Sequence, residues 1–293
     1  MTGKTINYYL MDGTPSGCIK CTIGTWAGVL YRIPRTELER CKGIDHLNQS
    51  GTYFLFGKEE DTDENTVYIG QAGARQNGGG ILQRLREHKR DTDKDYWTEA
   101  VVFTTSANYF GLTEISWLEN YFCSLAKNAK RYIVKNGNHP APGNVTMEKE
   151  SELEEFAEYA KIVIGFLGHK VFEPLDKPYP IQQESGNVLL YINKKSRGQN
   201  IHSTCLRTDE GFVVKAGSII KMSFADDVPL GIKKKRQEVG IDDNGVLMED
   251  VLFKSPSPAA VFVLGFRVSG YNVWKNADGK TLREIEAYEA AVS

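Results

Sequence analysis

Short apolar and polar runs alternate through the first quarter of the chain, and longer helical runs follow them. Residues 6–11, 18–24 and 28–33 are separated by turn sequences rich in Gly, Asp and Pro. Residues 51–57 and 66–70 are rich in aromatic and β-branched side chains, with a polar, acidic loop between them. We therefore expect five strands before residue 71.

The apolar period changes after a glycine-rich loop that ends at Gly80. A helix is expected to begin at residue 81, and residues 101–106 predict a further strand. Residues 109–130 place Ile115, Leu118 and Phe122 at helical spacing, and residues 147–168 repeat this pattern. The order β-β-α-β-α-α predicts a small mixed sheet flanked by helices.

The periodicity stops across residues 171–187, which hold three prolines (Pro174, Pro178 and Pro180) and read as a linker. Beyond it, residues 188–192 and 211–217 predict strands, and two short helices are expected to begin at Ser257 and Thr281. We predict an α+β fold with four segments. They are a β-rich segment 1–47, a domain 48–170, the linker 171–187 and a small α+β domain 188–293.

The composition is that of a globular protein, with 41% hydrophobic and 25% charged residues and a net charge of −2 in 293 residues. No run of about 18 apolar residues predicts a membrane span, and the N-terminus does not resemble a signal peptide. Five cysteines, an odd number, do not suggest a disulfide framework. We expect a cytoplasmic protein with no membrane partner.

Cys18 and Cys21 form a CxxC pair, with Cys41 and His46 further along the chain. These four residues are the types that bind structural zinc. However, residues 18–24 read as a strand, in which Cys18 and Cys21 point to opposite faces. We therefore interpret them as ordinary small apolar residues.

Five residues in the first half carry chemistry beyond that of a plain core. Tyr53 and Tyr68 lie on neighbouring predicted strands, Arg84 and His88 share one helix face, and Glu119 falls within an apolar helical stripe. An inward carboxylate must be paired, protonated or bound to a metal. Two phenols, a guanidinium, an imidazole and a carboxylate together suit phosphodiester hydrolysis.

The ordered set Gly51-Thr52-Tyr53, Tyr68-Ile69-Gly70, Arg84-x-x-x-His88 and Glu119 resembles the GIY-YIG nuclease superfamily over residues 51–140. This resemblance implies a small three-stranded sheet with flanking helices and an endonuclease that requires one divalent cation, Mg²⁺ or Mn²⁺. The expected substrate is DNA.

The resemblance also implies a role for each matched residue. Tyr53 is expected to act as general base, and Tyr68 to orient water or phosphate. Arg84 is expected to stabilise the transition state, His88 to assist proton transfer and Glu119 to bind the metal ion.

The family also has a downstream asparagine near a proline-rich turn. We assign it to Asn136, with Asn138 and Asn144 as alternatives. Two departures from the family pattern stand out. The first motif reads Gly-Thr-Tyr, and Gln71 occupies a position where many members have a lysine. The second departure bears on any mechanism that needs a lysine there to lower a tyrosine pKa.

The second half resembles an uncharacterised C-terminal module often attached to such nucleases and found with restriction-modification enzymes. The resemblance rests on Ser255–Ala260, Gly265, Ser269-Gly270 and Trp274-Lys275. It implies no mechanism for this half. A homodimer, or a partner protein from a defence or repair system, is compatible with this architecture.

The charges are unevenly distributed along the first half. Acidic residues concentrate at 58–65 and 148–158, and basic residues cluster at 32–42, 84–94 and 127–135. The basic clusters flank the candidate site and predict phosphate contacts. Lys233–Arg236 is either a second contact run or a solvated turn. The leading hypothesis is a DNA endonuclease; the alternative is a non-catalytic nucleic-acid-binding or interaction subunit of a repair, restriction or phage-defence system.

Overall fold

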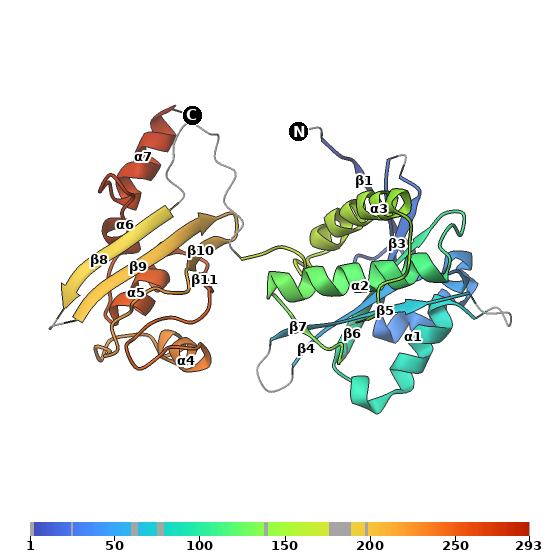
Figure 1. The fold of residues 1–293 in the computed structure, drawn as a ribbon, viewed down its shortest axis with the longest axis horizontal. Coiled ribbons are helices and arrows are strands. Elements are labelled where there is room, and N and C mark those ends of the chain that lie inside the picture. The colour runs from blue at the N-terminus through green and yellow to red at the C-terminus, as the bar shows by residue number, and fades with distance from the viewer. Residues whose placement is uncertain are drawn as a thin grey trace. The chain divides into compact units, whose positions relative to one another are not determined.

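The computed structural model describes residues 3–24, 26–59, 64–74, 79–137, 140–175, 189–196 and 199–292. The chain divides into two compact units, Met1–Pro174 and Leu175–Ser293. Each unit has one sheet and its own helices (Figure 1), which confirms the predicted α+β class. The division falls inside the range 171–187 predicted as a linker, of which residues 176–187 lie outside the described residues.

The N-terminal unit is built on a seven-stranded mixed sheet in the order β1-β2-β3-β6-β4-β5-β7. Its described strands are β1 (Ile6–Leu10), β2 (Ile19–Ile23), β3 (Gly28–Pro34), β4 (Gly51–Lys58), β5 (Asn65–Ala72), β6 (Trp97–Thr105) and β7 (Ile133–Val134). The β5–β7 pair is parallel, whereas the other pairs are antiparallel. Because β3 pairs with β6 along its whole length, the predicted segment 1–47 extends the same sheet.

Helices cover both faces of this sheet (Figure 1). The helices α2 (Leu112–Ala129) and α3 (Met147–Phe166) pack on one face, where Phe54 meets Phe122 at a ring-centroid distance of 5.1 Å. The other face is covered by α1 (Ile81–Arg90) and by 3-10 helices at Arg35–Gly43 and Asp45–Asn48. Strand alternation therefore sends Phe54 into the aromatic core and Tyr53 toward α1.

The C-terminal unit contains a four-stranded antiparallel sheet in the order β11-β10-β9-β8. Its strands are β8 (Leu189–Ser196), β9 (Gln199–Thr208), β10 (Gly211–Val214) and β11 (Val251–Phe253). Its helices are α4 (Leu230–Glu238), α5 (Pro256–Leu264), α6 (Gly270–Val273) and α7 (Leu282–Val292). The apolar helix α5 lies at the centre of this unit's core with Trp274 and Phe253.

Several features of this unit differ from the sequence expectation. Strand β11 and the helices α4 and α6 were not predicted. Strand β9 was not predicted, because exposed polar residues such as Asn200 and His202 interrupt its apolar run. Helix α5 begins at Pro256, and its N-cap residue Ser255 lies two positions before the predicted N-cap Ser257. The Ser257 hydroxyl instead accepts a hydrogen bond from the Gly270 amide at 2.9 Å.

The capping box predicted for the last helix is confirmed. The Glu284 carboxylate accepts hydrogen bonds from the Thr281 amide and hydroxyl, both at 2.7 Å, and the Glu284 amide donates to the Thr281 hydroxyl at 3.4 Å. Across the described part of the chain, no helix is both long and apolar enough to cross a membrane.

Candidate active site

Tyr53 and Tyr68 reach the same face of the sheet from adjacent strands. Strands β4 and β5 pair with Tyr53 opposite Gly70 and Leu55 opposite Tyr68, so the two tyrosines are diagonal neighbours with ring centroids 6.3 Å apart. The ring of Tyr53 lies across Gly70, where an added Cβ would come within 2.3 Å of its hydroxyl oxygen. Glycine at position 70 thus gives the Tyr53 ring its room.

His88 completes a three-ring cluster from α1. Its ring centroid lies 5.3 Å from that of Tyr53 and 5.2 Å from that of Tyr68. The Tyr53 hydroxyl and the His88 Nε2 atom are 2.7 Å apart, a hydrogen-bond distance. Tyr53 and His88 are both buried, with 1% and 2% exposure, so this contact is shielded from water.

Lys94 contacts the cluster from the end of the short 3-10 helix Thr92–Lys94. Its ammonium nitrogen lies 3.0 Å from His88 Nδ1 and 4.4 Å from the ring centroid of Tyr68. An ammonium group can only donate hydrogen bonds, so His88 Nδ1 must accept from it. A neutral His88 then carries its proton on Nε2 and donates it to the Tyr53 oxygen.

The environment keeps His88 neutral and Tyr53 protonated near pH 7. Burial, Lys94 and Arg84 lower the pKa of His88 to about 4. Burial raises the pKa of Tyr53 well above its ordinary range, and Tyr68 raises it further, whereas Arg84 lowers it. Arg84 is thus the neighbouring cation that favours Tyr53 ionisation.

Arg84 lies one helical turn before His88 on α1. Its guanidinium donates to the Glu87 carboxylate at 2.8 Å, and this bond, with Tyr53 close by, raises the pKa of Arg84. The Arg84 side chain remains 38% exposed. It can therefore meet an incoming anion while it stays next to the phenols.

Glu119 approaches β5 from α2. Its Oε2 atom accepts a hydrogen bond from Gln71 Nε2 at 3.0 Å, and the Gln71 amide also exchanges hydrogen bonds with the Ser116 hydroxyl at 3.0 and 3.1 Å. Burial raises the pKa of Glu119, whereas Gln71 and Arg84 lower it. Burial raises the pKa of Tyr68, and the Glu119 carboxylate raises it further. The five residues are therefore electrostatically coupled as one site.

Glu119 can serve as one ligand of a hard cation. No group of three His, Cys, Asp or Glu residues suited to hold a metal ion occurs among the described residues. A magnesium ion, however, usually keeps several waters and binds one or two carboxylates together with substrate phosphates. The residues present fit such a cation, with Glu119 as its protein ligand.

Asn136 lies beside the cluster but uses its amide on the backbone. Its Oδ1 atom accepts from the Ile69 amide at 3.0 Å, and its Nδ2 atom donates to the Ile69 carbonyl at 2.6 Å. It thereby holds β5 next to Tyr68, and a catalytic contact for it stays a prediction. Of its rivals, Asn144 is exposed and Asn138 lies outside the described residues.

The sequence interpretation missed Lys94 and the partner of Glu119. Lys94 lies in the polar run Asp91–Asp95, which has no periodicity that points inward. The hydrogen bond from Gln71 to Glu119 crosses from a strand to a helix far along the chain. The one sequence signal for Gln71 was that many members of the resembled family have a lysine at this position.

Cys18 and Cys21 lie on opposite faces of the sheet, as the strand pattern predicted. Cys21 belongs to the core under α2 and α3, and Cys18 to the core under α1. The Cys18 sulfur lies 3.5 Å from the sulfur of Cys41. The contact joins the start of β2 to the 3-10 helix Arg35–Gly43.

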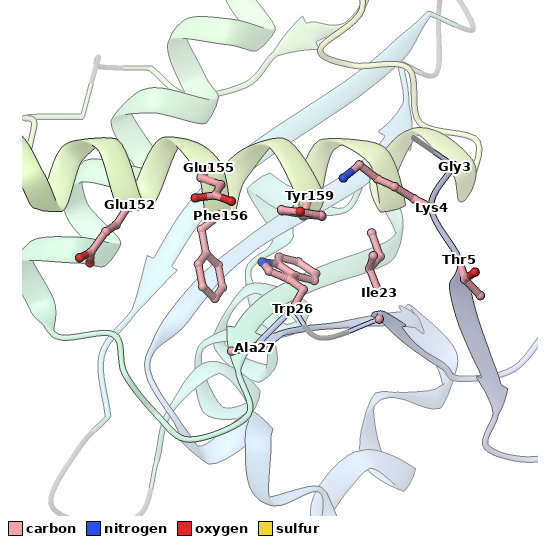
Figure 2. Close-up of a pocket in the computed structure, with 11 residues that line it drawn as sticks. Gly3, Lys4, Thr5, Ile23, Trp26, Ala27, Glu152, Glu155, Phe156 and Tyr159 are labelled. Atoms are coloured by element: carbon pink, nitrogen blue, oxygen red, sulfur yellow. The ribbon is translucent and has the colours of Figure 1, made fainter. Parts of the chain in front are cut away.

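A separate cavity of about 600 Å³ lies beneath α3. Figure 2 shows Trp26, Phe156 and Tyr159 pointing toward one another there, with Glu152 and Glu155 on the helix above. The Lys4 ammonium lies 4.2 Å from the ring centroid of Tyr159. None of the predicted site residues lines this cavity, so it is distinct from the cluster on the α1 face.

Comparison with known proteins gives a match in the second unit. Residues 193–286 match the model of a family described as a domain of unknown function (DUF4357). No match to a GIY-YIG family was found for residues 51–140. No curated protein and no solved structure matches the chain. The nuclease resemblance therefore rests on the motif residues and on their geometry.

Proposed function

We propose that the N-terminal unit is an endonuclease that hydrolyses phosphodiester bonds in DNA with one divalent cation, Mg²⁺ or Mn²⁺. The observation that carries this proposal is the buried Tyr53–His88 contact of 2.7 Å, with Lys94 on the other imidazole nitrogen. Arg84 and Glu119 are coupled electrostatically to the same phenols. These groups supply the proton transfer, the positive charge and the carboxylate that the reaction needs.

Glu119 would hold the cation, and Gln71 fixes the carboxylate by donating to one of its oxygens. When bound, the cation would neutralise charge on the phosphate and lower the pKa of a bound water. Arg84, partly exposed beside the phenols, would contact a phosphate oxygen and stabilise the charge that develops on it.

Tyr53 would first lose its own proton to solvent, and the resulting phenolate would accept the proton of the attacking water. Burial opposes this ionisation, so the phenolate must be stabilised by its neighbours. The His88 Nε2–H group donates to the Tyr53 oxygen, and Lys94 on Nδ1 strengthens that donor. Lys94 would thus act on Tyr53 through His88, whereas Arg84 lowers the pKa of Tyr53 directly. Tyr68 would orient water or phosphate.

A cleavage assay tests this proposal with plain, methylated and branched DNA, each with and without Mn²⁺. Glu119→Gln keeps an oxygen that can accept from Gln71 but removes the charge, so cleavage should fall by roughly 10³-fold or more. Cleavage by the Arg84→Ala variant should fall by about 10²–10³-fold. Glu114→Gln, on the same helix, is the matched control and should cleave normally, because Gln can replace Glu114 in its capping role. Unchanged cleavage by Glu119→Gln or Arg84→Ala would exclude the assigned site.

The alternative is a non-catalytic nucleic-acid-binding or interaction subunit of a repair, restriction or phage-defence system. Its support is the burial that raises the pKa of Tyr53, since a phenol that keeps its proton cannot act as base. This alternative predicts strong salt-dependent binding with no cleavage across all metals and substrates. Copurification of a methyltransferase or an ATPase would indicate the interaction role.

A further inference from the structure

The C-terminal unit presents three lysines that rest on aromatic rings, here called the lysine ridge: Lys194, Lys221 and Lys233. The ammonium groups of Lys194 and Lys221 lie 4.8 and 5.5 Å from the ring centroid of Phe266. The ammonium group of Lys233 lies 6.0 Å from that of Phe224. Such contacts restrict long side chains without neutralising their charge.

Backbone hydrogen bonds tie together the segments that carry the ridge lysines and their rings. The Lys221 amide donates to the Val263 carbonyl at 2.9 Å, and the Ala225 amide to the Gly265 carbonyl at 2.7 Å. These bonds tie residues 221–225 to the end of α5 and the residues that follow it. The strand that carries Lys194 reaches the same place through Phe266.

The buried side chain of Arg236 links the segments that carry the ridge lysines. The residue is only 7% exposed, and its guanidinium donates to the Phe262 carbonyl at 2.7 Å and to the Lys221 carbonyl at 2.5 Å. It also lies 4.4 Å from the ring centroid of Phe224. The basic run Lys233–Arg236 is therefore part of α4, not a solvated turn, and Arg236 faces inward while Lys233 belongs to the ridge.

The ridge lysines keep their charge available. Among the described residues, none of the three forms an ion pair, and the nearby Asp227 lies 3.9 Å from Arg267 instead. Next to Lys194 a pocket of about 730 Å³ opens at the edge of the sheet. None of the described residues that line it is an aspartate or a glutamate, and its polar lining includes Asn193, Lys194, His202, Asn272, Lys275 and Asn276.

We propose that the lysine ridge binds the phosphate backbone of DNA and anchors the substrate to the protein. Fixed, unpaired ammonium groups match the regular negative charge of a nucleic acid, and each phosphate contact releases counterions. The carboxylate-free pocket extends the positive surface beyond Lys194. The choice of DNA rests on the proposed function of the N-terminal unit. The binding itself does not depend on catalysis.

Binding is measured with full-length Glu119→Gln protein and a fluorescein-labelled 20-base-pair duplex, by anisotropy from 50 to 300 mM KCl. In that background the variant Lys194→Ala/Lys221→Ala/Lys233→Ala should bind on the order of tenfold more weakly per lysine at 50 mM salt. The slope of log Kd against log salt should fall by up to about 2.7, since each contact contributes about 0.9. The corresponding triple Lys→Arg variant should retain both affinity and slope.

The matched control replaces Lys149, Lys161 and Lys254 by Ala, which changes the net charge equally. Lys149 and Lys161 pair with glutamates on α3, and Lys254 follows β11, at the opposite edge of the sheet from β8. If the ridge variant and this control have equal affinity and slope, or if the parent does not bind at 50 mM salt, the proposal is overturned. Ridge-dependent binding without cleavage by wild-type protein would instead refute only the nuclease assignment.

Discussion

The basic clusters of the N-terminal unit and the lysine ridge of the C-terminal unit differ in the partners of their side chains. In the N-terminal unit the cations predicted to form a phosphate-binding surface are largely neutralised by neighbouring carboxylates: Arg32 by Glu99, Arg35 by Asp95, Arg86 by Glu39 and Lys135 by Glu59. In the C-terminal unit the ridge lysines rest on rings instead. A cluster of basic residues in the sequence therefore does not by itself indicate unpaired positive charge on the folded protein. We infer that the first unit performs the chemistry and the second holds the substrate.

The largest expected effect is that of a substitution at Tyr53, which tests whether the N-terminal unit performs the chemistry. Tyr53→Phe removes the phenol oxygen that pairs with His88, so single-turnover cleavage should fall by roughly 10²–10⁴-fold. Duplex affinity should not change, because the ridge is intact. Rapid-quench kinetics and anisotropy measure the two quantities separately.

Tyr31→Phe is the control for this variant. Tyr31 makes a comparable contact with His46 Nδ1 at 2.8 Å in the same unit, on β3, which β6 separates from β4 in the sheet. Equal losses of cleavage in both variants would indicate a general loss of packing, and would contradict the assignment of Tyr53.

The next effect concerns pH. The folded-state pKa of His88 is about 4, below the unfolded value of about 6.5, so the unfolded chain binds the proton first as pH falls. His88 should therefore contribute about 3 kcal/mol of stability above pH 6.5, and this is lost between pH 6.5 and 4. Urea unfolding of wild-type and His88→Gln protein at pH 7 and pH 4.5 measures the difference.

The exposed His202→Gln variant in the C-terminal unit is the control for the pH series. It should keep the wild-type pH dependence. A His88→Gln protein that loses stability with acid as steeply as wild type would show that His88 is not shielded in the folded state.

A smaller effect is expected for Lys94→Met. Removal of the ammonium group weakens the His88 donor to Tyr53, and cleavage should fall about tenfold, as for the loss of one charge-assisted hydrogen bond. The pKa of His88 should rise, because Lys94 lowers it in the wild type. Single-turnover rates and NMR titration of His88 report these two changes.

The ridge lysines give the opposite pattern. Their replacement should alter the salt dependence of binding while the rate at saturating DNA stays unchanged, whereas Lys94→Met should alter the rate but not the salt slope. If Lys94→Met changed only the salt slope, the lysine would be a phosphate contact and its place beside His88 would have no catalytic meaning.

Much of the N-terminal fold follows from local patterns. The strands β4 and β5 lie where runs of aromatic and β-branched residues predicted them. The helices α2 and α3 lie where the period of 3.6 residues predicted them. Strand β9 was not predicted, because exposed polar side chains interrupt its apolar pattern. The start of α5 was misplaced because two Ser-Pro pairs follow each other and both suit an N-terminus.

The sequence alone singled out the residues of the proposed chemistry. Tyr53 and Tyr68 lie on neighbouring predicted strands, and Arg84 and His88 are four apart on one helix. Glu119 falls within an apolar helical stripe. Tertiary structure decided the contacts among them. It placed Lys94 on His88, Gln71 on Glu119 and Asn136 on the backbone of Ile69.

Tertiary structure also decided which cations are neutralised. The four pairings that neutralise Arg32, Arg35, Arg86 and Lys135 join residues distant in sequence, so no local pattern encodes them. The amino-acid sequence identifies the candidate residues for catalysis and for binding. Their charge and protonation depend on burial and on neighbours that only the folded chain brings together.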